Sequence, residues 1–330
     1  MIKNTLFSFI ANRFKTERLC SCSNSLIIHP FYHTVTDNYL PHLTPLYKPK
    51  SVKEFQLDID YLCSHFQAIC IDDVLSYTEG KKKLEKNTFH LSFDDGLREV
   101  YTTVLPILYQ KEIPATIFIN SDFVDNKNLF YRHKAALVID LLNKKVPSEN
   151  SLNELEKLLG VKKAAFRTKI LAINYSEQNL LDKIASILNL DLDAYLKKQQ
   201  PYLSKDELLE MQKKGFTIAA HSINHPPFSE LKEEEQIRQV LESNAYVSKT
   251  FQASKNYFSF PFSDENIKDS VYHSIYETID LSFGITGINT RFNGKHIARI
   301  DMEKYGKNAK EAINKAYLKS LIKQKTTFIN

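Results

Sequence analysis

Short apolar runs that alternate with helical patterns constrain the fold of this chain more than any other feature. Many of the runs are rich in β-branched residues, and helical patterns lie between them, as at 52–66, 98–110 and 233–251. Strands that alternate with helices favour a parallel sheet, and nearly continuous apolar runs are typical of strands buried on both faces. The pattern therefore predicts an α/β fold whose parallel sheet is either open or closed into a barrel. The runs lie at 26–33, 67–71, 89–93, 115–120, 216–221, 257–262, 281–287 and 296–300.

One interval, at about 126–203, interrupts this alternation. It contains no strand pattern and has the periodicity of several consecutive helices. We therefore expect one α/β domain over 26–330 with a helical insertion at about 126–203, preceded by a tail or short helix at 1–25. Directly after the insertion, Ser204 and Glu207 have the spacing of a capping box, which predicts the start of the next helix.

The charge and cysteine content exclude several classes of protein. A net charge of +5 results from 44 Lys and Arg against 39 Asp and Glu, and the basic clusters are interleaved with acids, so no nucleic-acid partner is predicted. The four cysteines match no zinc-binding spacing and are too few for a disulfide framework, which favours reduced thiols in the cytoplasm. No apolar run reaches the ~18 residues that a transmembrane helix needs.

The first 19 residues, MIKNTLFSFIANRFKTERL, lack the continuous apolar region and the small-residue cleavage site of a signal peptide. The sequence therefore predicts a cytoplasmic protein, either free or at the inner face of the membrane. The same segment fits a short basic helix with Leu6, Phe9, Ile10 and Phe14 on one side. Such a helix is expected either to contact a membrane surface or to dock on the rest of the protein.

Polar residues interrupt the apolar pattern where several predicted strands end. In parallel α/β folds the functional loops lie beyond the carboxyl ends of the strands, so residues at these positions are expected to meet at one rim. The residues concerned are His33, Asp94, Asp95, His221, Pro261 and Phe262.

Two of these positions contain groups that suit a metal site. His221 and His225 are four residues apart, and in a helical turn both would point the same way. Two imidazoles and one carboxylate complete a zinc-type site with an open position, and the Asp94–Asp95 pair supplies that carboxylate and a second one as general base. Each motif alone also has a plain explanation, since Asp-Asp-Gly is a common turn and two histidines at this spacing occur by chance. Together, at strand ends, they predict a metal-dependent hydrolase.

These motifs resemble those of the polysaccharide deacetylases, the carbohydrate esterases that share the NodB homology domain. The first motif of that family is matched by Phe93-Asp94-Asp95-Gly96 and the second by His221-Ser222-Ile223-Asn224-His225. The segments PFYHTV and YLSKDELLEMQKKGFTIAAHSINHPPFSEL are also similar to the family's first strand and to its approach to the second motif. The resemblance covers about 26–125 and 204–305.

The resemblance implies a distorted (β/α)7-type barrel that removes an N-acetyl group from an amino sugar. Asp94 is then the general base, while Asp95, His221 and His225 bind a divalent ion, which is expected to be Zn²⁺, with Co²⁺ or Ni²⁺ as alternatives. The backbone N–H of Phe262 is expected to stabilise the oxyanion together with the metal.

The sequence departs from the family in its later motifs. The third motif normally contains an arginine, but Ser259 occupies that place, and Arg299 is a candidate to orient the base instead. An ordinary ion pair between Arg299 and Asp301 is the alternative. The chain has no tryptophan and no clear terminal histidine motif, so we take His296 as the general acid, with His33 and His90 as other candidates. The alternation of His90 with core residues favours a structural role for it.

The substrate is the least constrained part of the prediction. We expect an N-acetylated saccharide or surface-polysaccharide precursor, either lipid-linked or nucleotide-linked, with His33, Pro261 and Arg132 in contact with it. Arg132 belongs to a basic cluster at 131–134 that suits an anionic group or simply starts a helix. The alternatives are a saccharide-binding protein that has lost catalysis, and a metal-dependent hydrolase of another bond, such as a formamide or a phosphate ester.

Overall fold

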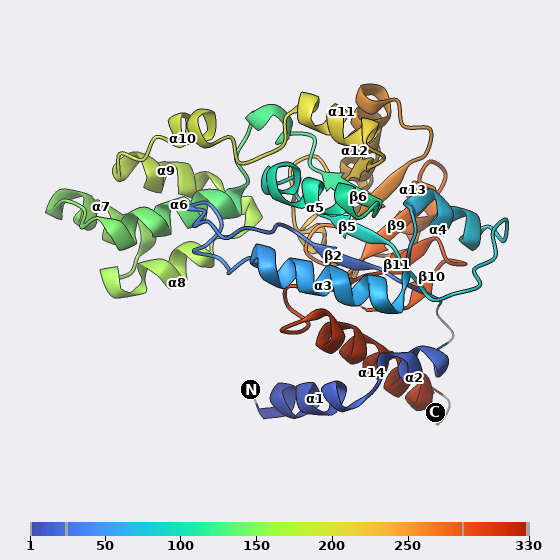
Figure 1. Cartoon of the computed structure of the whole chain (residues 1–330). Helices are drawn as coiled ribbons and strands as arrows, with labels where there is room; N and C mark the ends of the chain where they lie inside the picture. The colour runs from blue at the N-terminus through green and yellow to red at the C-terminus, as the bar shows by residue number, and fades with distance from the viewer. Residues whose placement is uncertain (1, 24–25, 286, 328–330) are drawn as a thin grey trace.

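The computed structural model describes residues 2–23, 26–285 and 287–327. Its centre is a curled nine-stranded sheet (Figure 1) in the order β10-β11-β9-β8-β7-β6-β5-β2-β12. Neighbouring strands are parallel except for the β10–β11 pair. The strands are β2 (Pro30–Tyr32), β5 (Leu91–Phe93), β6 (Ala115–Ile119), β7 (Thr217–Ala220), β8 (Tyr257–Ser259), β9 (Leu281–Gly284), β10 (Thr290–Arg291), β11 (His296–Ala298) and β12 (Ile300–Asp301).

Residues 296–301 close this sheet into a barrel. β11 pairs with β9 at one edge, and β12, which follows one residue later, pairs with β2 at the other edge. The backbone N–H of Arg299 donates to the carbonyl of Gly284 (3.1 Å), whereas the N–H of Ile300 donates to the carbonyl of His29 (2.9 Å). One continuous segment therefore joins both edges, and the predicted α/β fold with a distorted barrel is confirmed.

A second, three-stranded sheet extends the amino ends of two barrel strands. It has the order β1-β4-β3, with β1 (Ile27–Ile28) and β4 (Thr88–Phe89) running almost directly into β2 and β5. The third strand is β3 (Gln67–Ala68). The apolar run predicted at 26–33 is thus divided between two sheets, and the division lies at His29, just before Pro30, whose nitrogen cannot donate a hydrogen bond.

Helices cover the outside of the barrel, and their starts follow the sequence signals. Ser204 and Glu207 form the expected capping box: Ser204 Oγ accepts from the Glu207 N–H (3.2 Å), and Glu207 Oε2 accepts from the Ser204 N–H (2.9 Å). Phe55 of α3 and Val240 of α12 are fully buried in the core that these helices form with the sheet. The helices are α3 (Val52–His65), α4 (Ile71–Thr78), α5 (Leu105–Gln110), α11 (Lys205–Lys213), α12 (Glu233–Phe251) and α13 (Asp269–Ile275).

Five further helices between β6 and β7 form a lobe on one side of the barrel, coloured green to yellow in Figure 1. This lobe has an apolar cluster of its own, in which Leu155, Ile170 and Leu181 are fully buried. It occupies the interval in which the sequence lacks strand patterns. The helices are α6 (Tyr131–Lys144), α7 (Glu149–Leu159), α8 (Phe166–Leu171), α9 (Asn179–Ile187) and α10 (Leu192–Gln199).

The two ends of the chain meet in a separate helical layer below α3 (Figure 1). The helix α14 (Ala309–Thr327) packs on α3, and α1 (Ile2–Arg13) and α2 (Thr16–Ser21) pack on α14. Among the described residues, no helix is both long enough and apolar enough to cross a membrane. The four cysteines all lie in the described part of the chain and form no disulfides.

Candidate active site and metal centre

A left-handed turn at the end of β5 positions the first two candidate residues. Asp94 directly follows the strand, and Asp95 and Gly96 have φ of 70° and 63°, values that are costly for residues other than glycine. A Cβ at Gly96 would lie 3.2 Å from the side chain of Ile119 on β6, so a larger residue there would also crowd Ile119. The turn directs the two neighbouring carboxylates to different partners.

The two candidate histidines follow β7, but not in a helix. Ser222 and His225 have φ of 75° and 58°, and the backbone N–H of His225 donates to Ser222 Oγ (3.0 Å). The amide of Asn120, which directly follows β6, donates to the same hydroxyl (3.2 Å). The helical turn expected between His221 and His225 is therefore wrong, although this compact bend still brings both rings to one position.

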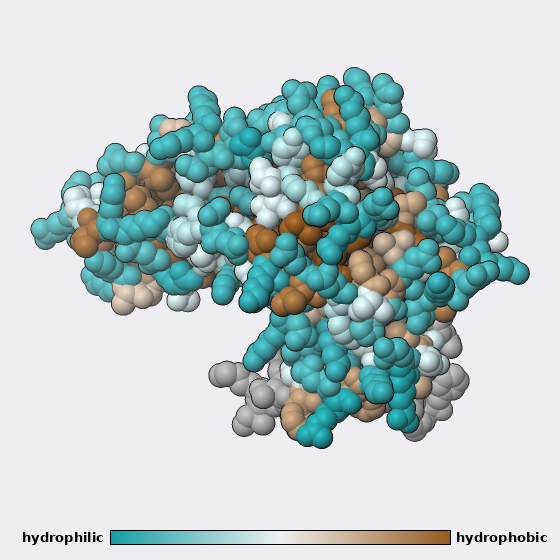
Figure 2. Space-filling model, viewed as in Figure 1, coloured by the Kyte–Doolittle hydropathy of each residue, from teal (hydrophilic) through white to brown (hydrophobic). Residues whose placement is uncertain are grey.

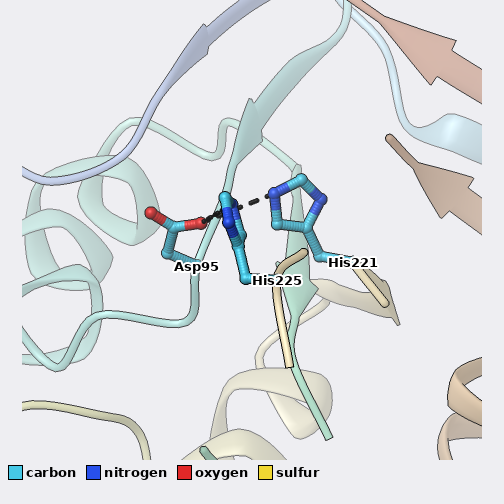
Figure 3. Close-up of side chains that lie close together, drawn as sticks. All are labelled: Asp95, His221 and His225. Carbon is cyan, nitrogen blue, oxygen red and sulfur yellow. Dashed lines mark ion pairs between the residues drawn. The ribbon is translucent and has the colours of Figure 1, made fainter. Parts of the chain in front are cut away.

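Asp95, His221 and His225 form a buried cluster between the ends of β5 and β7 (Figure 3). Asp95 Oδ1 lies 3.1 Å from His225 Nε2 and 3.4 Å from His221 Nε2. Two ligands of a tetrahedral zinc ion, each about 2.0–2.1 Å from it, are roughly 3.4 Å apart. The spacing of the three atoms is thus that of ligands to one small ion.

The hydrogen bonds around the cluster also fit a metal. His221 Nδ1 donates to the carbonyl of Ser259 (2.8 Å), which leaves the lone pair of Nε2 directed at Asp95. Asp95 Oδ1 is buried, and no described group donates a well-formed hydrogen bond to it, an arrangement that costs free energy unless a cation is bound. Burial alone would raise the pKa of Asp95, but His225 and His221 hold it well below its usual range. An ionised carboxylate and two imidazoles are a donor set that zinc prefers.

The second carboxylate, Asp94, is bound by Arg299. Its Nη1 and Nη2 donate to the two oxygens of Asp94 at 2.8 and 2.7 Å, and both side chains are buried. The other donors of the guanidinium reach Ser92 Oγ (3.1 Å), Ser259 Oγ (2.6 Å) and the carbonyl of Gly284 (3.2 Å). All five N–H donors of an arginine are therefore used.

This arrangement decides between the two expected partners of Arg299. Arg299 pairs with Asp94 and not with Asp301. Asp301 accepts hydrogen bonds from the backbone N–H groups of Glu303 and Lys304. Burial would raise the pKa of Asp94, but the guanidinium outweighs it and holds the pKa below its usual value. Asp94 Oδ2 also lies 3.9 Å from His221 Nε2, so an ionised carboxylate lies beside the cluster of Asp95, His221 and His225.

A second charged pair lies where β2 ends. His33 hydrogen-bonds through Nδ1 to Glu303 Oε2, and the His33 backbone N–H donates to the same oxygen (3.1 Å). The Glu303 side chain is 4% exposed, whereas that of His33 is 20% exposed. Burial lowers the pKa of His33, but the Glu303 carboxylate overcomes this and raises it to about 10. His33 is therefore a protonated, partly accessible imidazolium at neutral pH.

The structure does not support His296 as the general acid. Its ring is 2% exposed, with Nε2 bonded to Asp264 (3.0 Å) and Nδ1 to Ser282 (2.8 Å), and burial lowers its pKa. It also lies three residues before Arg299 on an extended segment, roughly 10 Å from the rim. His90 is likewise fully buried against Thr116, and burial holds its pKa well below the usual value. His296 and His90 are thus neutral core residues.

Phe262 lies beside the cluster, and Pro261 directly precedes it. Phe262 has a φ of 56°, and its ring contacts that of His225 edge to face, with the centroids 4.6 Å apart. Its backbone N–H donates no hydrogen bond to any residue that the structure describes. The carbonyl of Pro261 accepts from the Ser263 N–H (2.6 Å), which forms the tight turn that presents Phe262.

Arg132 is not available to a substrate in the expected way. Its Nη1 donates to the carbonyl of Leu171 (2.5 Å) at the carboxyl end of α8, where a cation is stabilised by the helix dipole. The neighbouring Phe130 instead reaches the site, and its ring centroid lies 4.6 Å from that of His225. The basic cluster at 131–134 is therefore a helix start, and an aromatic residue before it forms one wall of the site.

Glu303 and Phe130 are site residues that the sequence analysis missed. Glu303 contacts a histidine 270 positions away, and no motif marks either residue. The only available signal is position, because Glu303 follows the strand that closes the barrel and Phe130 begins the insertion.

Comparison with known proteins identifies a family for this chain. The family model for polysaccharide deacetylases matches residues 81–275, which is more than half of the chain. No match was found among curated proteins.

Three solved structures share the fold at low sequence identity. The Streptococcus pyogenes deacetylase PplD in complex with acetate has a TM-score of 0.57 and 13% identity, over 86% of this chain and 95% of that chain. IcaB from Ammonifex degensii has a TM-score of 0.54 and 14% identity, over 88% of this chain and 97% of that chain. A de-N-acetylase from Aggregatibacter actinomycetemcomitans has a TM-score of 0.53 and 15% identity, over 85% of this chain and 96% of that chain.

The motifs, the barrel and the family match thus lead to one assignment. The chain belongs to the polysaccharide deacetylase family and is a carbohydrate N-deacetylase.

Proposed function

We propose that this chain is a metal-dependent hydrolase that removes an N-acetyl group from an amino sugar in a saccharide or surface-polysaccharide precursor. The observation that carries the proposal is the buried cluster of Asp95, His221 and His225 beside the Arg299-bound Asp94. Zinc is the ion that this donor set favours, with cobalt and nickel as alternatives. When bound there, the ion supplies Lewis-acid polarisation of the amide carbonyl and a lower pKa for water.

Asp94 acts as the general base. Because Arg299 keeps it ionised, it accepts a proton from the attacking water at neutral pH. Both carboxylate oxygens are fixed by the guanidinium, so the base does not rotate away from the cluster beside it. Arg299 thereby positions the base in place of the arginine that Ser259 replaces.

The negative charge that develops on the acetyl carbonyl oxygen is stabilised by a hydrogen-bond donor from the protein. The unengaged backbone N–H of Phe262 serves this purpose, because its turn holds it next to His225. A backbone donor that is fixed before the reaction stabilises the developing charge without reorganisation.

His33 acts as the general acid in place of the expected His296. It is protonated at neutral pH because of Glu303, and its side chain is partly exposed at the same rim as Asp94. In the second step the carbon–nitrogen bond breaks, the sugar nitrogen takes the proton from His33, and acetate leaves with the oxygen from water. An ionised base and a protonated acid thus lie at the same rim of the barrel.

The alternative of a saccharide-binding protein without catalysis loses one part of its support. That alternative rested on the missing third-motif arginine, the missing tryptophan and the lack of a clear terminal histidine motif. Arg299 supplies a guanidinium to Asp94 in place of the first of these. An acetylated precursor that is lipid-linked or nucleotide-linked, encountered in the cytoplasm or at the inner membrane face, remains the substrate that we expect.

The experiment is a substrate panel with the zinc-loaded protein. N-acetylated oligosaccharides, a nucleotide-linked N-acetyl sugar and the matching N-formyl compounds would be tested for acetate or formate release. We expect acetate release that Asp94→Asn lowers by at least about 100-fold, while the matched control Asp122→Asn retains it. Full activity of Asp94→Asn, or formate release alone, would contradict the proposal.

A further inference from the structure

The layer formed by α1, α2 and α14 is much more basic than the rest of the chain. In the sequence, residues 1–23 contain four basic residues and one acidic residue, and residues 307–327 contain six basic residues and one acidic residue. These segments together have a net charge of +8, whereas the whole chain has +5. The remainder, which includes the barrel and the insertion, is therefore slightly acidic.

The α1 helix is apolar toward the protein and also away from it. Ala11 is fully buried where α1 packs on α14, but Phe9 is 57% exposed and Ile10 is 40% exposed. Phe14, expected on the same side as Phe9, packs on the core instead. Helices that are apolar on more than one face normally have both faces covered, so this arrangement leaves one apolar face open.

Cations border the open face. The guanidinium of Arg13 lies over the ring of Phe9 at 4.6 Å from its centroid, and Arg13, Lys15 and Arg18 are all exposed. Figures 1 and 2 show that this layer projects from the main body of the protein. The face is thus accessible, and it combines aromatic, aliphatic and basic side chains.

We propose that the α1–α2–α14 layer binds the surface of a membrane that contains anionic lipids. Phe9 and Ile10 enter the boundary between headgroups and acyl chains, and the surrounding cations contact the lipid phosphates. Charge argues against the other occupant of such a face, a second copy of the chain, because two layers of net charge +8 repel each other. The layer lies on the membrane and does not span it, in agreement with the absence of a spanning helix among the described residues.

The test is sedimentation of the full chain with vesicles, which does not depend on the proposed reaction. Vesicles of phosphatidylcholine with 30 mol% phosphatidylglycerol would be compared with phosphatidylcholine alone, at low and high salt. We expect binding only to the anionic vesicles, weakened by salt. Each cation near an anionic surface contributes about fivefold to affinity, so the triple variant Arg13→Glu, Lys15→Glu, Arg18→Glu should lose at least about 100-fold.

Matched controls separate this face from the general charge and hydrophobicity of the protein. Lys157→Glu, Lys197→Glu, Lys198→Glu makes the same change of charge on exposed sites of the insertion and should leave binding intact. Phe9→Ser with Ile10→Ser should abolish binding, whereas Val146→Ser, at a side chain that is 81% exposed, should not. Deacetylation of a water-soluble oligosaccharide should be unchanged in all variants, which shows that they fold.

Three outcomes would overturn the proposal. One is equal binding of the wild type to neutral and anionic vesicles, and another is equal loss of binding in the control variants. The third is a concentration-dependent dimer in light scattering that Phe9→Ser with Ile10→Ser abolishes, since this would assign the face to self-association.

Discussion

Replacing Arg299 with methionine tests the pairing on which the proposed base depends. The substitution keeps a long apolar stem but removes five donors, and it leaves Asp94, Ser92 and Ser259 with unpaired oxygens in a dry site. Removing one partner of a buried ion pair costs about 3–5 kcal/mol. That is at least about a fifth of the ~5–15 kcal/mol by which most domains are stable.

The measurement is the free energy of unfolding from urea denaturation, with and without zinc. The matched control is Arg238→Met, because Arg238 makes two ion pairs on the surface, to Glu235 and Glu242, with a side chain that is 47% exposed. Exposed pairs contribute at most about 1 kcal/mol, so the control should remain near the wild type.

A double variant identifies the origin of the loss. If the cost of Arg299→Met comes from the uncompensated charge, adding Asp94→Asn should recover much of it, because a neutral amide tolerates burial better than a lone carboxylate. A cost below about 1 kcal/mol for Arg299→Met, or no recovery on adding Asp94→Asn, would refute the reasoning.

Two further predictions follow from His33 and Gly96. The raised pKa of His33 means that its pairing with Glu303 stabilises the fold fully below pH ~6.5 and that this contribution is lost as the pH rises through about 10. Glu303→Gln should remove this stabilisation and move the alkaline limb of kcat/KM to lower pH; an unchanged limb would exclude His33 as the acid. Gly96→Ala should lower the free energy of unfolding more than Gly160→Ala. Both glycines have a left-handed φ, but only at position 96 would the added methyl group crowd Ile119. The backbone strain common to both variants is about 1–2 kcal/mol. If urea denaturation shows the same loss of unfolding free energy for both, Ile119 moves aside without cost and the prediction is wrong.

The residues that could be predicted from the sequence are those that act within short motifs. Asp94 and Asp95 share one turn, and His221 and His225 share one bend, so their proximity is encoded locally. The alternation of strands and helices then brings both segments to the same rim, because parallel strands present their carboxyl ends together. The same alternation predicted a parallel sheet, open or closed, and only the resemblance to the family implied that it closes into a barrel.

The partners of these residues could not be predicted, because they come from distant strands. The sequence left two roles open for Arg299, orientation of Asp94 or an ion pair with Asp301. The closure of the barrel places Arg299 between β9 and β2, where it pairs with Asp94. His296 was chosen for its residue type, yet it lies deeper on the same segment and both of its nitrogens are engaged in the core. The pairing of His33 with Glu303 depends on register between β2 and β12, and register is not visible in a single sequence.

The most direct test of the metal centre is the metal content of the purified protein. We predict close to one equivalent of zinc, cobalt or nickel in the wild type and in the control His273→Ala, and none in Asp95→Ala or His221→Ala. Acetate release should disappear with chelation and return with zinc. A wild type that contains no metal and takes up none, or variants that keep the full equivalent, would contradict the assignment of Asp95, His221 and His225 as ligands.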